Sequence, residues 1–187
     1  MKCPSFVIRP DNAAVLSVDH QDKVLEHVQD HETVLSQAVN LVKVARLAGV
    51  AVMKIEHCPD KLGPTNRVLA EAMGPVPAYP KVTWSAFRNS EIEAAVSALG
   101  VRQLIIFGVE CHICVCQTTL DALDLGYQVF VVADAASSIK PMDRDIALAR
   151  VRAAGAYVTT AQAAAFELIE RADTDLFRRA HPILKLM

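Results

Sequence analysis

The sequence predicts an α/β protein of three layers (α/β/α), in which a parallel sheet of roughly six strands lies between two layers of helices. Gly49, Gly100, Gly126 and Gly155 each follow a helix-like segment and precede an apolar one, which is typical of helices that end on glycine before a strand. Four segments, by contrast with the helix-like ones, are short and almost continuously apolar: residues 13–18, 50–55, 104–109 and 129–133. Strands buried on both faces have this composition, and their alternation with helices predicts right-handed β-α-β units.

The helix-like segments show the matching periodicity. Residues 34–45 carry one apolar stripe at helical spacing, made of Val34, Leu35, Ala38, Val39, Val42 and Ala45. Ser90 is followed three residues later by Glu93, which indicates a capping box, so a second helix is predicted to begin at Ser90 and run to about Leu99. Two weaker strand-like segments, residues 79–82 and 156–159, bring the predicted sheet to about six strands.

The composition is that of one domain, predicted to span residues 1–187, since 52% of the residues are hydrophobic. The 19 basic and 21 acidic residues give a formal charge of -2, which disfavours nucleic acid or anionic lipid as a partner. Residues 1–15 lack the pattern of a secretory signal, and no apolar run reaches the ~20 residues that cross a bilayer. We therefore expect no membrane partner and a cytoplasmic location, where the five cysteines are thiols.

In an open parallel sheet, functional residues follow the carboxyl ends of the strands. Cys114 follows segment 104–109 and directly precedes a helix-like segment, residues 117–125. Free N–H groups and the helix dipole stabilise an anion there, which predicts a lowered pKa for the Cys114 thiol and a site for an oxyanion. The position fits equally well a small apolar cysteine packed beneath the helix, and position alone does not decide between the two interpretations.

Three charged residues also lie at or just after the ends of predicted strands. Asp19 ends segment 13–18, where its carboxylate could take a proton from a thiol on a neighbouring loop or could be a turn or N-cap residue. Asp134 follows segment 129–133 and has the same two interpretations. Lys81 could lower the pKa of a nearby thiol, whereas a lone lysine in a loop is usually only solvated.

Three separated motifs occur in order: Val-Leu-Ser-Val-Asp-His-Gln at 15–21, Lys-Val-Thr-Trp-Ser-Ala-Phe at 81–87 and Gly-Val-Glu-Cys-His-Ile-Cys-Val at 108–115. They resemble the opening strand, the lysine motif and the nucleophile motif of the isochorismatase-like cysteine hydrolases, a superfamily that includes nicotinamidases. The similarity covers roughly residues 13–170. With Leu-Gly-Pro-Thr at 62–65, the chain looks most like the isochorismatase domain-containing proteins, a branch with poorly defined substrates. The resemblance implies a Rossmann-like isochorismatase-like hydrolase fold.

The resemblance also implies a catalytic triad. Cys114 would be the nucleophile, Asp19 the general base, and Lys81 the residue that orients or electrostatically supports the pair. The reaction would hydrolyse a small amide or related carbonyl substrate through a covalent thioester intermediate. A cis peptide between Val109 and Glu110 would turn the backbone N–H groups of Glu110 and Cys114 toward one oxyanion.

Comparison with relatives extends the expected site. Nicotinamidase-type members carry an Asp and two His as metal ligands after the second strand, but residues 55–60 here contain a single histidine, so we predict no metal and no cofactor. Asp134 takes a structural role by this resemblance. The residues assigned to a pocket wall are His57, Trp84, Phe87 and His112. A loop role for His57 stays open, and Trp84, Phe87 and Tyr79 could each be a pocket wall or a core or interface residue. Because relatives are commonly homo-oligomeric, we expect a homo-oligomer.

Two other function classes remain in competition. Cys111 and Cys114 form a C-x-x-C at a strand-to-helix junction, the setting of a thiol-disulfide redox protein, although such folds place this motif after an early strand. A soft metal site made of Cys111, His112, Cys114 and Cys116 lacks the usual second pair of ligands at a distance. A catalytically silent scaffold of the same fold is the other class, but it would have no chemical reason to keep all three triad residues.

Overall fold

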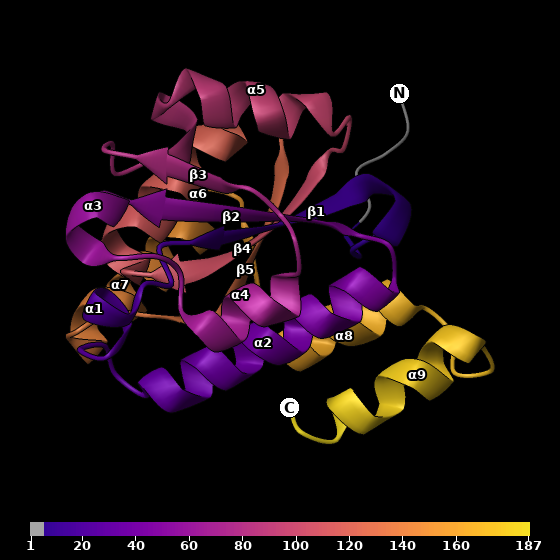
Figure 1. Ribbon diagram of the computed structural model, residues 1–187. Coiled ribbons are helices and arrows are strands. Elements are labelled where there is room, and N and C mark those ends of the chain that lie inside the picture. The colour runs from indigo at the N-terminus through magenta and orange to yellow at the C-terminus, as the bar shows by residue number, and fades with distance from the viewer. Residues whose placement is uncertain (1–5) are drawn as a thin grey trace.

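The computed structural model describes residues 6–187, which form a three-layer α/β/α fold (Figure 1). Within these residues, six strands form one sheet in which every neighbouring pair is parallel. The strands are β1 (Ala13–Val18), β2 (Ala51–His57), β3 (Ala78–Lys81), β4 (Gln103–Val109), β5 (Gln128–Ser137) and β6 (Tyr157–Thr159). Their order across the sheet is β3-β2-β1-β4-β5-β6, so the chain starts in the middle and winds outward to each edge. The predicted fold class is confirmed.

Helices cover both faces of the sheet. One layer consists of α2 (His31–Leu47), α4 (Arg67–Met73), α8 (Ala161–Ile169) and α9 (Asp175–Leu184), and the other of α5 (Ser90–Ala98), α6 (Cys116–Asp124) and α7 (Pro141–Ala153). Figure 1 shows α5 above the strands and the first layer below them. Side chains alternate along the central strands, so Val15 packs into the first layer and Leu16 into the second. Burial on both faces explains why these strands are almost entirely apolar.

Short helices occupy the loops between the longer elements. They are η1 (Pro10–Asn12), α1 (Asp22–Leu25), α3 (Pro59–Leu62), η2 (Ala86–Arg88) and the π-helical turn η3 (Cys111–Val115). The last four follow β1, β2, β3 and β4, which are adjacent in the sheet and end at the same edge. Side chains in these four loops are therefore brought together, as the sequence predicted. None of the helices between residues 6 and 187 is long and apolar enough to traverse a lipid bilayer.

The start of α5 differs from the prediction by one residue. Asn89 is the N-cap, because its side-chain oxygen accepts hydrogen bonds from the N–H groups of Glu91 and Ile92. Ser90 is already the first helical residue, so the predicted capping box with Glu93 is wrong. Asparagine satisfies the free N–H groups of a helix start as well as serine does, and the two residues are adjacent in the sequence here.

Strand β5 is longer than predicted, which changes the position of Asp134. This residue lies inside β5 rather than after it. Its Oδ1 accepts a hydrogen bond of 2.7 Å from the N–H of Ala161, the first residue of α8. A carboxylate at that position satisfies one of the free N–H groups of the helix. Asp134 therefore has a structural contact, in agreement with the role that the resemblance implied.

Gly108 allows β1 and β4 to approach closely just before they end. Its φ is +146°, and a Cβ at this position would lie 1.9 Å from the carbonyl oxygen of Val18. Such a contact is far shorter than any that real Cβ atoms show, so no other residue fits without a backbone shift. The close approach brings the loop after β4 next to Asp19, which directly follows Val18.

Candidate active site

The side chains of Asp19 and Lys81 meet at the carboxyl ends of β1 and β3. Lys81 Nζ donates a hydrogen bond of 2.7 Å to Asp19 Oδ2 and one of 3.2 Å to the carbonyl oxygen of Thr83. The Lys81 side chain is 0% exposed and the Asp19 side chain 3% exposed. An ammonium buried at this depth without a partner would lose its hydration, which costs roughly several kcal/mol. The Asp19 carboxylate is therefore what permits a charged Lys81 here.

The backbone holds Asp19 in an unusual conformation. Its φ is 57°, in the left-handed region that costs a residue with a side chain about 1 kcal/mol. The N–H of Asp19 still donates a hydrogen bond of 3.0 Å to Ile55 O on β2, so the strand pairing continues up to the turn. Burial raises the pKa of Asp19 above its usual value, and Lys81 opposes this rise. Asp19 Oδ1 is buried and, within residues 6–187, has no hydrogen-bond partner apart from the Cys114 thiol, whose interaction with this carboxyl also opposes the rise in its pKa.

Cys114 lies beside this ion pair in the π-helical turn η3. Burial raises the pKa of its thiol to about 12; the Asp19 carboxylate adds to the rise, whereas the Lys81 ammonium opposes it. The predicted lowering of the pKa by a helix N-terminus is therefore wrong. The reason is that η3 packs Cys114 into the apolar core, where it is only 5% exposed, so desolvation of the anion dominates. The thiol is protonated near neutral pH and needs a base to become a nucleophile.

The neighbouring cysteines do not change this picture. Cys111, Cys114 and Cys116 are all buried free thiols. Burial also raises the pKa of Cys111 to about 12, whereas a reactive redox dithiol depends on a thiol of lowered pKa. Within residues 6–187, no group of three or more His, Cys, Asp or Glu side chains has the arrangement of a metal site.

Glu110 connects the loop after β4 to the loop after β5. The peptide bond between Val109 and Glu110 is cis, which confirms the bond implied by the resemblance. Glu110 Oε2 accepts a hydrogen bond of 3.0 Å from Ile139 N, and the Glu110 carbonyl accepts bonds of 3.2 Å and 3.3 Å from the N–H groups of Ile113 and Val115. These bonds anchor the start of η3, which carries Cys114.

His57 and Trp84 form a stacked pair beside the ion pair. Their ring centroids lie 4.9 Å apart with an interplanar angle of 24°. Partial burial and the nearby Lys81 ammonium lower the pKa of His57, so its ring is neutral near pH 7. Trp84 is 52% exposed and therefore lies at the surface of the site. Phe87, by contrast, is buried in the core with its ring 5.8 Å from that of Tyr127.

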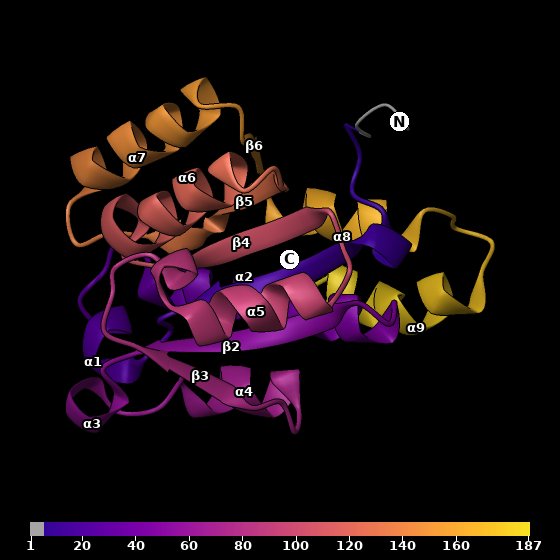
Figure 2. The same ribbon diagram turned by 90° about the horizontal axis from the view of Figure 1, so that it is seen from above.

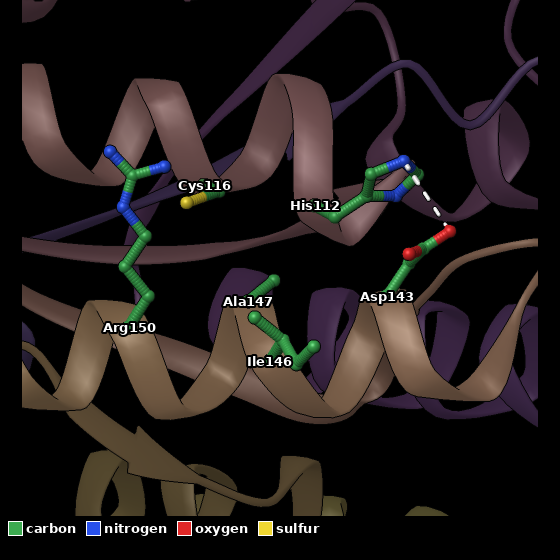
Figure 3. Close-up of a pocket in the computed structure, with 6 residues that line it drawn as sticks. All are labelled: His112, Cys116, Asp143, Ile146, Ala147 and Arg150. Carbon is green, nitrogen blue, oxygen red and sulfur yellow. Dashed lines mark ion pairs between the residues drawn. The ribbon is translucent and has the colours of Figure 1, made fainter.

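His112 belongs to η3 and faces α7. Its Nδ1 is 2.9 Å from Ser138 Oγ, and its Nε2 is 3.9 Å from Asp143 Oδ2. It lines an open pocket of about 150 Å³ (Figure 3) together with Cys116, Asp143, Ile146, Ala147 and Arg150. Of the residues assigned to a pocket wall, His57 lies near Asp19 and Lys81 and stacks on Trp84, whereas His112 lines the pocket beside α7.

The structure adds one positioning residue that the sequence analysis did not identify. Gln21 is fully buried, and its Nε2 donates hydrogen bonds to the carbonyl oxygens of His57 (3.0 Å) and Gly63 (2.6 Å). Its Oε1 accepts a bond of 2.8 Å from the N–H of His57. Gln21 thus ties the end of β2 to the end of β1. The available signal was its place in the motif at 15–21, two residues after Asp19.

Comparison with known proteins identifies the family of this chain. The family model of the isochorismatase domain matches residues 13–163. Isochorismatase domain-containing protein 1 of Danio rerio is 31% identical over 180 residues, which cover 96% of this chain and 63% of that protein. The chain thus spans less than two thirds of this relative.

Two solved structures are also similar. YcaC from Pseudomonas aeruginosa, solved with hexane-2,5-diol and covalent acrylamide, has a TM-score of 0.90 and 32% identity, covering 96% of this chain and 92% of that one. The YcaC gene product of Escherichia coli, an octameric hydrolase of unknown specificity, has a TM-score of 0.89 and 29% identity, covering 97% and 94%. On the matched domain and this shared structure, the chain belongs to the isochorismatase-like hydrolase family, alongside the isochorismatase domain-containing proteins.

Proposed function

We propose that the chain is a cysteine hydrolase that cleaves a small amide or related carbonyl compound through a covalent thioester. One observation carries this proposal. The protonated Cys114 thiol interacts with the buried carboxyl of Asp19, whose Oδ2 is held by Lys81 while its Oδ1 has no other hydrogen-bond partner within residues 6–187. One carboxylate oxygen is thus positioned by the lysine, and the other is left to accept the thiol proton.

The first half of the reaction forms the thioester. Asp19 Oδ1 takes the thiol proton as Cys114 Sγ bonds to the carbonyl carbon of the substrate, and the carbonyl π electrons move onto its oxygen. The backbone N–H groups of Glu110 and Cys114 stabilise this oxyanion. The C=O bond then re-forms as the C–N bond breaks, and Asp19 gives its proton to the nitrogen, which leaves as ammonia or an amine.

The second half hydrolyses the thioester. Water attacks the acyl carbon and passes a proton to Asp19, the C–S bond breaks, and the proton from Asp19 restores the Cys114 thiol as a carboxylic acid is released. Lys81 is suited to support both halves, because its ammonium stabilises whichever of the two neighbouring groups carries the negative charge. No cofactor is needed for these steps.

Two further features support the proposal. The stacked rings of His57 and Trp84 offer a flat apolar wall next to the triad, suited to a small acyl group. The related YcaC from Pseudomonas aeruginosa was solved with covalent acrylamide, a reagent that alkylates thiols at its vinyl carbon, which agrees with a reactive nucleophile in this family. Because the Escherichia coli relative is octameric, we also propose that this chain acts as a homo-oligomer.

The test is a screen of small primary amides near neutral pH, with ammonia release as the readout and acid-quenched intact mass spectrometry of the protein. We expect ammonia release from at least one amide, together with an acyl adduct on Cys114. Cys114→Ser and Asp19→Asn should abolish both. Cys58→Ser is the matched control, since Cys58 is a half-buried thiol next to His57. Turnover that survives Cys114→Ser, or a panel with neither turnover nor adduct, would contradict the proposal.

A further inference from the structure

The outward face of α7 carries an apolar stripe made of Met142, Ile146, Ala149 and Ala153, all of them exposed. Met142 is 71% and Ile146 60% exposed. Spacings of four, three and four residues place the stripe on one side of the helix, and such spacing is typical of the apolar seam between paired helices.

The opposite side of α7 is the one that the protein itself covers. There Val151 is buried, and within the described residues α7 packs against η3, α6, β5 and β6. Figure 2 shows α7 as the outermost element on its side of the molecule. The stripe therefore has no partner within the part of the chain that the structure describes.

Charged residues flank the stripe in a regular order. Asp143 and Arg150 lie along one flank, and Asp145 and Arg152 along the other; on each flank the two residues are seven positions apart, which is about two turns. Figure 3 shows Ile146 between Asp143 and Arg150 on α7. Acidic residues near the start and basic residues near the end of a helix also suit its dipole, but the dipole gives no reason for an exposed apolar stripe between them.

The two arginines are available for a partner. Among residues 6–187, neither Arg150 nor Arg152 takes part in an ion pair. The aspartates have only weak ones, since Asp143 lies 3.9 Å from a His112 nitrogen and Asp145 lies 3.5 Å from a nitrogen of its neighbour in sequence. Both signs of charge therefore remain exposed on the flank of Asp145 and Arg152, whereas on the other flank Arg150 is exposed and Asp143 is half-buried beside His112.

We propose that α7 binds α7 of a second copy of this chain in antiparallel orientation, about a two-fold axis that passes between residues 147 and 148. This inference rests on the proposal that the chain forms a homo-oligomer, and it names the surface involved. About that point the positions of the apolar stripe correspond, and each flanking aspartate corresponds to an arginine. Met142 then faces Ala153 of the second copy and Ile146 faces its Ala149, so a large residue meets a small one at each level.

The charges select this orientation. In the antiparallel pair, Asp143 lies beside Arg150 of the second copy, and Asp145 lies beside its Arg152. A parallel pair would instead set opposite flanks against each other, so Asp145 could meet Arg150 of the second copy while Asp143 and Arg152 would lose their partners. The antiparallel pair therefore makes four opposite-charge pairs and the parallel pair only two. Because α7 also packs against η3, the interface would lie directly behind the turn that carries Cys114.

The test measures molecular mass in solution by sedimentation velocity and by light scattering after gel filtration. We expect the wild type at an even multiple of the 20.3 kDa chain mass. Ile146→Asp and Arg152→Asp should each halve the mass, while the charge swap D145R/R152D should restore it, because Arg and Asp then meet with reversed polarity. Asp145 and Arg152 do not line the pocket beside His112, so the swap leaves that region intact. Arg179→Asp, an exposed arginine on α9 across the sheet, is the matched control and should change nothing.

The outcomes separate the two proposals. A wild type of 20.3 kDa would overturn both the oligomer and the α7 interface. An oligomer whose mass survives Ile146→Asp and Arg152→Asp would overturn the interface alone, and dissociation by Arg152→Asp without rescue by the swap would overturn the antiparallel charge pairing. Circular dichroism of each variant verifies folding, and the charge variants decide the matter if Ile146→Asp fails to fold. Amide hydrolysis is scored separately, so neither result depends on finding the substrate.

Discussion

Lys81 Nζ lies 2.7 Å from Asp19 Oδ2, and both side chains are shielded from solvent. An ion pair at this depth stabilises the fold little in net terms, because both charges have lost their hydration. Its importance is that each charge depends on the other.

We therefore expect Lys81→Met and Asp19→Asn each to lower the free energy of unfolding by about 3 to 5 kcal/mol, whereas the double variant should lose less than the sum of the two. Urea denaturation of the four proteins measures this cycle. Arg171→Met, which breaks the exposed Arg171–Asp173 pair, is the control and should leave the urea midpoint unchanged. Additive losses at Asp19 and Lys81 would show that the two charges are not coupled.

The same two residues should have opposite effects on the reactivity of Cys114. Asp19 raises the pKa of the thiol and Lys81 lowers it, so alkylation by iodoacetamide near neutral pH should be on the order of tenfold or more faster in Asp19→Asn and slower in Lys81→Met. Hydrolysis should fall in both variants, because a more ionised thiol does not replace the base. Peptide mapping follows each site, with the half-buried Cys58 as an internal reference. Slower labelling of Cys114 in Asp19→Asn would contradict this account.

His20 should make the fold sensitive to acid. Burial lowers its pKa from 6.5 to about 4, so the folded state binds fewer protons than the unfolded state between these values. The corresponding stability is fully present above pH 6.5 and is lost as the pH falls toward about 4, which amounts to roughly 3 kcal/mol. Urea denaturation at several pH values should show a weaker acid dependence in His20→Gln than in the wild type. His27→Gln, at an exposed histidine, should retain the wild-type dependence.

Gly108 should tolerate no side chain. Gly108→Ala places a methyl group 1.9 Å from Val18 O, and we expect the free energy of unfolding to fall by about 3 kcal/mol or more. Activity should also be lost, because Asp19 directly follows Val18 in the chain. Gly126→Ala is the matched control, because that glycine has φ +83° with nothing within 4 Å, and it should cost only about 1 kcal/mol. Thermal and urea unfolding compare the two variants. Equal losses would mean that the contact with Val18 is relieved by a backbone shift.

Much of the fold could be predicted because its signals are local. A strand buried on both faces must be apolar along its whole length, and a helix against a sheet must repeat its apolar residues at helical spacing, so segments such as 13–18 and 34–45 could be recognised from neighbouring residues alone. Boundaries were less certain. Asn89 and Ser90 are both good caps, and β5 continues past Asp134 through a register shift against β4 that no local pattern signals.

The sequence by itself determined which residues stand at the carboxyl ends of the strands, and thus that Asp19, Lys81 and the Cys114 turn would gather at one edge of the sheet. Only the tertiary structure decided how deep they lie. Proximity to a helix start predicts an acidic thiol, whereas packing of distant segments around η3 buries Cys114 and raises its pKa to about 12. Desolvation depends on everything that surrounds a group, and here it outweighs the helix dipole, which is why a base beside the thiol is needed.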